Sequence, residues 1–191
     1  MRVIAGSAGG IRLAVPKHGV RPTMDRVKAA IFSSLGEMVI GARVLDLFAG
    51  TGGLGIEALS RGASSAVFVD EDGRSAEMIE RNLAKTQLKG RVRQQNVFDF
   101  LRRVSTSETF EIIFADPPYE KTKSGEDYVE KLLISEALPR LLKPGGIFIL
   151  EKRPAENSLE SNVWHVMRQK TYGATEVLFL SAIRNSQSAI K

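Results

Sequence analysis

The fold of this chain is decided by one stretch, residues 44–59, which reads VLDLFAGTGGLGIEAL. Its first half is an apolar run, typical of a buried parallel strand. Gly50, Gly52 and Gly55 then fit the pattern G-x-G-x-x-G, in which glycines permit a tight turn and let backbone N–H groups approach a ligand. An apolar helix follows from residue 53. Strand, glycine turn and helix together predict an α/β nucleotide-binding unit, although this pattern alone is shared with NAD enzymes.

Acidic residues lie at two informative places around this turn. Asp46 interrupts an otherwise apolar strand, where a lone carboxylate is costly unless it has a partner. It could receive a ligand's ammonium group, or it could simply stabilise the turn. Asp70 ends the next apolar run, 66–69, about twenty residues beyond the glycines, where an acid binds ribose hydroxyls. Glu71 and Asp72 are also acidic, so the choice of Asp70 depends on its position at the strand end.

A second motif, residues 110–119, reads FEIIFADPPY. The apolar run 112–115 predicts a strand, and two prolines force the chain out of the sheet directly after it. In open α/β sheets ligands bind just outside the carboxyl ends of strands. One ligand site at this strand end would therefore contain Asp116, the Pro117-Pro118 backbone and the Tyr119 ring. Such an arrangement suits a flat base with an exocyclic amine. The alternative without a functional role is a strand followed by an ordinary turn.

The rest of the chain alternates between strands and helices. Strands are expected at 44–48, 66–69, 92–95, 112–115 and 147–150, with the turn 143–146 before the last. Helices are expected at 24–35, 53–61, near 74–86, from about 98 and near 128–142. This alternation predicts a mostly parallel sheet with helices on both faces. Two further strands, 164–169 and 176–180, are expected to supply an antiparallel C-terminal hairpin.

The two ends of the chain differ from this body. Residues 2–6 and 10–15 are short runs around Ser7-Ala8-Gly9-Gly10, which predicts an N-terminal β-hairpin. We therefore expect a basic extension at 1–20, one catalytic domain at 21–183 and a polar tail at 184–191.

Charge is concentrated at the N-terminus. Residues 1–28 contain one acid, Asp25, and six bases: Arg2, Arg12, Lys17, Arg21, Arg26 and Lys28. This excess equals the net charge of the whole chain, +5. A basic lobe on a neutral body predicts a phosphate-rich partner, and the alternative is a solvated basic face.

Composition argues against membrane, secreted and metal-binding proteins. The 191 residues suffice for one domain with a sizeable core. No apolar run approaches the ~20 residues that span a membrane, and the N-terminus does not fit a signal peptide. Since the chain has no cysteine and two histidines, disulfides and thiolate metal sites are excluded and no metal is expected. A cytoplasmic location is the default expectation.

Taken together, 46–59, Asp70 and 116–119 resemble a class I, Rossmann-like S-adenosylmethionine-dependent methyltransferase that acts on amino groups. More narrowly, the chain resembles the RsmD family, which methylates guanine N2 in small-subunit (16S) ribosomal RNA. The resemblance covers about residues 3–180 and also includes 21–28, RPTMDRVK, and 164–173, WHVMRQKTYG. The segment 21–28 separates this family from DNA methyltransferases that share Asp-Pro-Pro-Tyr. Ser7-Ala8 departs from the larger residues common there.

The resemblance implies roles for particular residues. S-adenosylmethionine would contact Asp46, Phe48, Ala49, Gly50, Thr51, Gly52, Gly55, Asp70, Asn96 and Val97. Asn96 and Val97 would hold the adenine, although Asn96 equally fits a helix N-cap. The catalytic motif would be Asp116, Pro117, Pro118 and Tyr119, with Tyr119 stacking on the target base. Arg2, Arg12, Lys17, Arg21 and Arg26 would contact RNA.

Three function classes remain in competition at this stage. The first is an RNA guanine-N2 methyltransferase that acts as a monomer on small-subunit ribosomal RNA or on the assembling subunit. The second is a DNA or other RNA amino-methyltransferase of the Asp-Pro-Pro-Tyr type. The third is a non-catalytic nucleotide-binding or NAD-type module, in which residues 116–119 would have no role. The polar stretch 120–127 is either a lid over the base or a surface loop.

Overall fold

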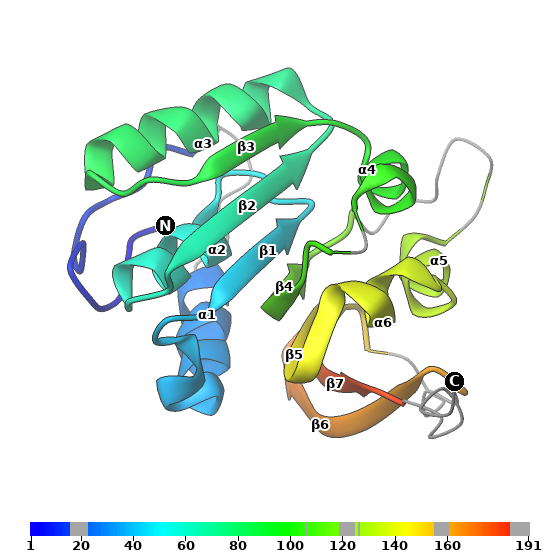
Figure 1. Cartoon of the computed structure of the whole chain (residues 1–191). Helices are drawn as coiled ribbons and strands as arrows, with labels where there is room; N and C mark the ends of the chain where they lie inside the picture. Colours follow the sequence, from blue (N-terminus) through cyan, green and yellow to red (C-terminus); the bar gives the residue numbers. More distant parts are fainter. Residues whose placement is uncertain (16–22, 106, 119–124, 126, 155–160, 184–191) are drawn as a thin grey trace.

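The computed structural model describes residues 1–15, 23–105, 107–118, 125, 127–154 and 161–183. A seven-stranded sheet with the order β3-β2-β1-β4-β5-β7-β6 forms its centre (Figure 1). Its strands are β1 (Arg43–Leu47), β2 (Ser65–Asp70), β3 (Arg91–Gln94), β4 (Phe110–Ala115), β5 (Leu142–Lys152), β6 (Trp164–Tyr172) and β7 (Thr175–Ala182). The first five strands are parallel, β7 is antiparallel to β5, and β6 is antiparallel to β7. The predicted mostly parallel sheet with an antiparallel C-terminal hairpin is confirmed.

Helices cover both faces of this sheet (Figure 1). One core lies under α1 (Thr23–Leu35), α2 (Gly53–Ser60) and α3 (Gly73–Thr86). The other lies under α4 (Val97–Arg103), α5 (Tyr128–Leu133) and α6 (Ala137–Leu141). A short 3₁₀ turn, η1 (Gly36–Val39), follows α1. Two buried cores on one sheet are what near-continuous apolar strands require.

The helix α1 follows the apolar spacing of its sequence. Val27, Ile31 and Leu35 recur every four residues, and all three are buried. Phe32 adds an aromatic contact to Phe114 of β4, with ring centroids 5.7 Å apart. The predicted face of this helix is therefore confirmed, and it fixes the start of the domain on the sheet.

The single helix predicted near 128–142 is wrong. Two short helices, α5 and α6, take its place, with a break at residues 134–136. Pro139 explains the break, because a proline inside a helix removes a hydrogen bond and clashes with the preceding turn. Starting a new helix at Ala137 puts Pro139 in the first turn, where it is tolerated.

The predicted turn at 143–146 is also different in the structure. These residues belong to β5, which begins at Leu142. Leu142 pairs with Phe110, and the register then shifts so that Ile147 pairs with Ile112. Lys143–Gly146 therefore form an irregularity inside the strand.

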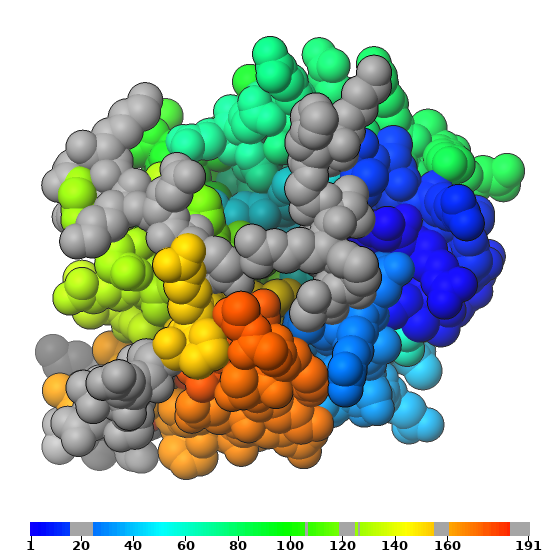
Figure 2. Space-filling view, turned by 180° about the vertical axis from the view of Figure 1, so that it is seen from behind, coloured from blue at the N-terminus to red at the C-terminus, as the bar shows by residue number. Residues whose placement is uncertain are grey.

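The N-terminal segment, residues 1–15, folds back on itself but forms little sheet. Arg2 and Arg12 make one isolated antiparallel bridge. The tip bonds to the end of α2 instead, since Ser7 N–H donates to the Ser60 carbonyl at 2.8 Å. Val3, Ala8 and Leu13 are buried in the core under α1–α3, and Figure 2 shows the segment in dark blue directly beside α1. The division at residue 20 stays a prediction.

Candidate functional site

The strand order reverses between β1 and β4, and polar side chains gather at the carboxyl ends of the strands beside this point. Such a switch point is where open α/β sheets bind ligands. Asp46 lies in β1, and Asp70 ends β2. Asp116 comes directly after β4, and Glu151 lies near the end of β5. Four neighbouring strands thus each bring a carboxylate to one edge of the sheet.

Asp46 is buried beside the glycine turn, with 2% of its surface exposed. The Gly55 N–H donates to its Oδ2 at 2.8 Å. Burial raises the pKa of Asp46 to about 8, with smaller contributions from the negative Asp116 and Asp70 and an opposing one from the Gly55 N–H. Asp46 therefore does stabilise the turn. Among the described residues, however, no cation compensates the charge of its carboxyl group. That is the environment in which a ligand's ammonium group is stabilising.

The glycine turn is shaped by close contacts. Gly52 has φ 77°, a conformation that favours glycine. A Cβ on Gly55 would lie 2.3 Å from Cε1 of Phe68, so only glycine lets α2 approach β2 this closely. Phe48 has φ 55° although it is not a glycine, which marks a strained position of the kind that clusters at ligand sites.

Asp70 fastens this turn to β2. Its Oδ2 accepts a hydrogen bond from Gly50 N–H at 2.7 Å, and its Oδ1 accepts from Asp72 N–H at 3.0 Å. Beside it, Ala49 N–H donates to the Val69 carbonyl at 3.1 Å. The sequence-predicted residues Asp46, Phe48–Gly52, Gly55 and Asp70 therefore converge on one wall of the site. Their contacts with a methyl donor stay predictions.

Asn96 serves as the N-cap of α4. Its Oδ1 accepts from Phe98 N–H at 3.0 Å and from Asp99 N–H at 3.3 Å. Its Nδ2 donates to Oε2 of Glu71 at 2.7 Å, which links the ends of β2 and β3. Val97 is the buried first residue of α4. The capping interpretation thus holds, and the adenine role of both residues stays a prediction.

Phe98 belongs to the core rather than to an open face. Its ring stacks on Tyr128 with centroids 6.1 Å apart and contacts Phe48 at 6.2 Å. Phe48 also meets Tyr128 edge-on at 5.5 Å. This aromatic cluster ties the start of α5 to the strained end of β1.

Asp116 leaves the sheet beside Asp46. The register pairs Asp46 with Phe114, so Asp116 lies two residues further along the neighbouring strand and on the same face. Burial raises its pKa to about 6. Pro117 is buried and Pro118 is exposed, whereas Tyr119 and most of the following loop lie outside the described residues.

Glu151 is a site residue that the sequence reasoning missed. Strand alternation from Ile149 puts it on the same face as Asp116, and β4 and β5 are neighbours through the pair Ala115 and Leu150. Burial raises its pKa to about 8, with further contributions from the negative Asp116 and Asp46. The signal was present, because the apolar run 147–150 ends in an acid as 66–69 and 112–115 do. No group of acids or histidines in the described part of the chain is arranged to hold a metal ion.

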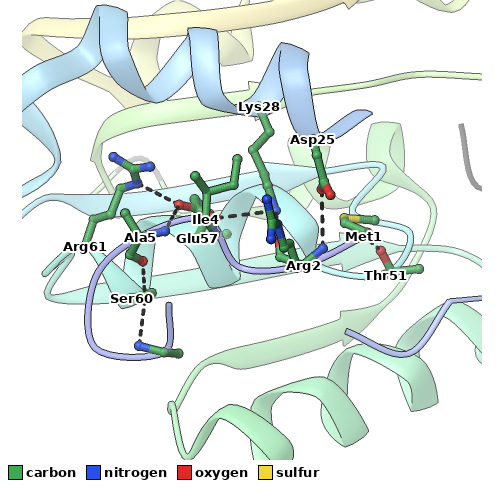
Figure 3. Close-up of polar contacts among 12 residues, drawn as sticks. Met1, Arg2, Ile4, Ala5, Asp25, Lys28, Thr51, Glu57, Ser60 and Arg61 are labelled. Atoms are coloured by element: carbon green, nitrogen blue, oxygen red, sulfur yellow. Dashed lines mark hydrogen bonds and ion pairs between the residues drawn. The ribbon is translucent and has the colours of Figure 1, made fainter. Parts of the chain in front are cut away.

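The N-terminal segment is fastened to the rest of the fold through Glu57 of α2 (Figure 3). This fully buried carboxylate accepts from Ile4 N–H at 2.7 Å and from Ala5 N–H at 3.1 Å. It also pairs with Arg61 at 2.7 Å and with Lys28 at 3.4 Å. Burial lowers the pKa of Lys28, and the neighbouring Glu57 partly offsets this. Lys28 is therefore an internal cation, and it does not contribute to a basic surface.

Asn82 of α3 connects this segment to the glycine turn, and no pattern in the sequence indicated this role. Its Oδ1 accepts from Ala14 N–H at 2.7 Å, and its Nδ2 donates to the carbonyls of Ala14 at 3.0 Å and Thr51 at 2.9 Å. The side chain is fully buried. The N-terminal segment and the turn thus share one buried amide.

The predicted nucleic-acid residues divide into two groups. Arg2, Arg12 and Arg26 are exposed. The bridge between Arg2 and Arg12 puts their side chains on one side of the segment. Lys17 and Arg21 lie outside the described residues. The RNA contacts of all five stay predictions.

Known proteins identify the family. The family described as Conserved hypothetical protein 95 matches residues 1–181. This chain belongs to it.

Similar proteins are named or described as methyltransferases. YlbH of Bacillus subtilis, provisionally named an rRNA methyltransferase, is 39% identical over 93% of this chain and 96% of its own. Ribosomal RNA small subunit methyltransferase D of Haemophilus influenzae is 31% identical over 91% and 89%. The solved structure of yhhF from Escherichia coli, provisionally described as a methyltransferase, is 28% identical, has a TM-score of 0.78 and covers 95% of this chain and 97% of that chain. The class I methyltransferase fold and the RsmD-type resemblance of the sequence are thereby confirmed.

Proposed function

We propose that this protein transfers a methyl group from S-adenosylmethionine to the exocyclic N2 amine of a guanine in small-subunit ribosomal RNA. The single observation that carries the proposal is the position of Asp116-Pro117 beside Asp46 at the switch point. One strand end thus offers acceptors for an amine, and the next offers a buried acid for a donor's ammonium group. Similarity to a protein named as a ribosomal RNA small subunit methyltransferase supports the substrate class.

The described residues fit S-adenosylmethionine. Asp46 has a buried carboxyl with no cation beside it in the part of the chain that the structure describes, which suits the ammonium of the methionine part. The glycine turn comes close to Phe68 and leaves backbone N–H groups at the start of α2. Asp70 stands at the end of β2, where a ribose is held in related folds.

Asp116 and the Pro117 carbonyl are suited to hold the amine. The lone pair of guanine N2 is delocalised into its ring, so the nitrogen is a poor nucleophile. Two acceptors for its N–H bonds orient it and favour a lone pair directed at the methyl group. The acceptors also stabilise the positive charge that develops on the nitrogen.

The bound donor supplies an electrophilic methyl on sulfur, so that one N–C bond forms as the C–S bond breaks and S-adenosylhomocysteine is released. The nitrogen then carries one proton too many. Asp116, as the acceptor for the amine, would take that proton, because a carboxyl with a pKa of about 6 is ionised near neutral pH and can pass the proton on to solvent.

The exposed Arg2 and Arg12 support an RNA partner, since guanidinium groups that face solvent on one side of a segment suit phosphates. In the described residues no helix has the length and apolar character needed to cross a bilayer. A cytoplasmic location and a monomeric state belong to the proposal and stay predictions.

The test uses the full chain with S-adenosylmethionine carrying a labelled methyl group. Small-subunit ribosomal RNA, purified small subunits and double-stranded DNA are offered separately, and the methylated nucleoside is identified after digestion. We expect N2-methylguanosine from the RNA or the subunits. Label in DNA, or on adenine N6, would replace this proposal by the alternative amino-methyltransferase.

A further inference from the structure

Glu151 has the features of a residue that contacts the target base. It is half-buried, and its side chain has no hydrogen bond or ion pair within the described part of the chain. Its neighbour Lys152 is engaged elsewhere, because it forms an ion pair with Glu176 on β7. Successive side chains of a strand point to opposite faces, so Lys152 is not the counter-charge of Glu151.

The sheet directs Glu151 toward the acceptor for the amine. Asp116 follows Phe114 by two residues and Glu151 follows Ile149 by two, and Phe114 pairs with Ile149. Both acids therefore extend from the same face of neighbouring strands, which lie about 4.8 Å apart. Burial raises the pKa of Glu151, and the negative charges of Asp116 and Asp46 raise it further, as expected if the three carboxyls border one space.

A guanine presents two kinds of donor side by side, the N2 amine and the N1–H. Adenine and cytosine carry an acceptor at the ring nitrogen beside their amines. An oxygen next to Asp116 is therefore well placed to distinguish guanine from other amino-bearing bases. A carboxyl oxygen accepts a hydrogen bond whether the group is ionised or protonated.

We propose that Glu151 accepts the N1–H of the target guanine while Asp116 holds its N2 amine, so that Glu151 selects guanine at this site. The inference depends on the proposed function, because it names a contact to that substrate. It assigns base selection to β5 and orientation of the reacting amine to β4.

The test compares two small-subunit RNAs, each assembled by ligation around the modified position. One carries guanine there, and the other carries N1-methylguanine, which keeps the N2 amine and the O6 but has a methyl in place of the N1–H. Methyl transfer to N2 is measured for the wild-type protein, Glu151→Ala and Glu151→Gln. Glu77→Ala is the matched control, since Glu77 is exposed on α3.

For the wild type and Glu77→Ala we expect a preference for guanine of roughly 5- to 150-fold, the range for a paired contact to a base edge. Glu151→Gln should keep most of this preference, because its amide oxygen also accepts the N1–H. Glu151→Ala should lose it, since the contact is gone and space for the N1-methyl is created. Binding of S-adenosylhomocysteine should be unchanged in every variant.

Two outcomes would separate the inference from the proposed function. An unchanged guanine preference in Glu151→Ala, or an equal loss of transfer to both RNAs, overturns the contact while leaving the methyltransferase assignment in place. Failure of the wild type to methylate guanine N2 in any RNA or subunit overturns the proposed function itself.

Discussion

Replacing Asp46 by asparagine should stabilise the ligand-free protein and weaken its binding of the methyl donor. The pKa of Asp46 is about 8 in the folded protein and 3.8 in a model compound. As pH rises through 3.8 the unfolded chain releases this proton, but the folded protein keeps it until about pH 8. The folded state binds more protons throughout this interval, so the contribution of Asp46 to stability falls as pH rises.

The magnitude follows from the same two values. A difference of about four in pKa, at 1.36 kcal/mol each, is on the order of 5 kcal/mol lost between about pH 4 and pH 8. Below pH 4 both states are protonated and nothing is lost. Asparagine cannot ionise, and its amide oxygen can still accept the hydrogen bond from Gly55 N–H. Asp46→Asn should therefore gain stability over the wild type as pH increases.

The assay is urea unfolding of both proteins at pH 5 and pH 8, with Glu77→Gln as a control for the loss of one exposed charge. The stability advantage of Asp46→Asn should be several kcal/mol larger at pH 8, and the control should show no such change. Titration with S-adenosylhomocysteine should show affinity reduced by roughly 1–3 kcal/mol in Asp46→Asn. A pH-independent difference between the two proteins would refute the uncompensated burial of this acid.

Three further results are expected. Asp116→Ala should keep donor affinity and reduce turnover by about 10²–10³, as loss of an oriented polar group does; near-normal turnover would remove it from the mechanism. Arg2→Gln with Arg12→Gln should lower the salt dependence of RNA binding by about 0.7–0.9 per lost phosphate contact, with donor affinity preserved; an unchanged slope in filter binding would make the segment purely structural. Asn82→Ala should lower the free energy of unfolding in urea by about 1–3 kcal/mol and weaken donor binding. Intact donor affinity in this variant would show that the N-terminal segment and the glycine turn are not coupled.

The sheet could be predicted because its information is local. Apolar runs of four or five residues, ended by glycine, proline or an acid, mark β1, β2 and β4 within two residues of their observed bounds. The glycine turn is equally local, since φ 77° at Gly52 and the close approach at Gly55 each restrict a single position. The break between α5 and α6 was missed because a periodic apolar pattern outweighed one proline, Pro139.

The contacts of the N-terminal segment could not be predicted, since they join residues far apart in the sequence. Glu57 reads as an ordinary acid in an apolar helix, but it accepts from Ile4 and Ala5, more than fifty residues away. Charge counting also misled at Lys28, which looked like part of a basic surface and is buried against Glu57. Only the pairing of segments reveals which charges face solvent.

The acids at the strand ends show why site residues contradict the ordinary rules for a strand. Burial raises the pKa of Asp46, Asp116 and Glu151, and neighbouring negative charges raise the pKa of Asp46 and Glu151 further. Each ionised acid is therefore a cost to the folded chain alone. A ligand that brings an ammonium group to Asp46 and N–H donors to the other two removes that cost on binding. The same carboxyls therefore destabilise the ligand-free protein and favour the complex. Hence the variants that stabilise the protein at high pH should be those that lose affinity for the methyl donor or selectivity for guanine.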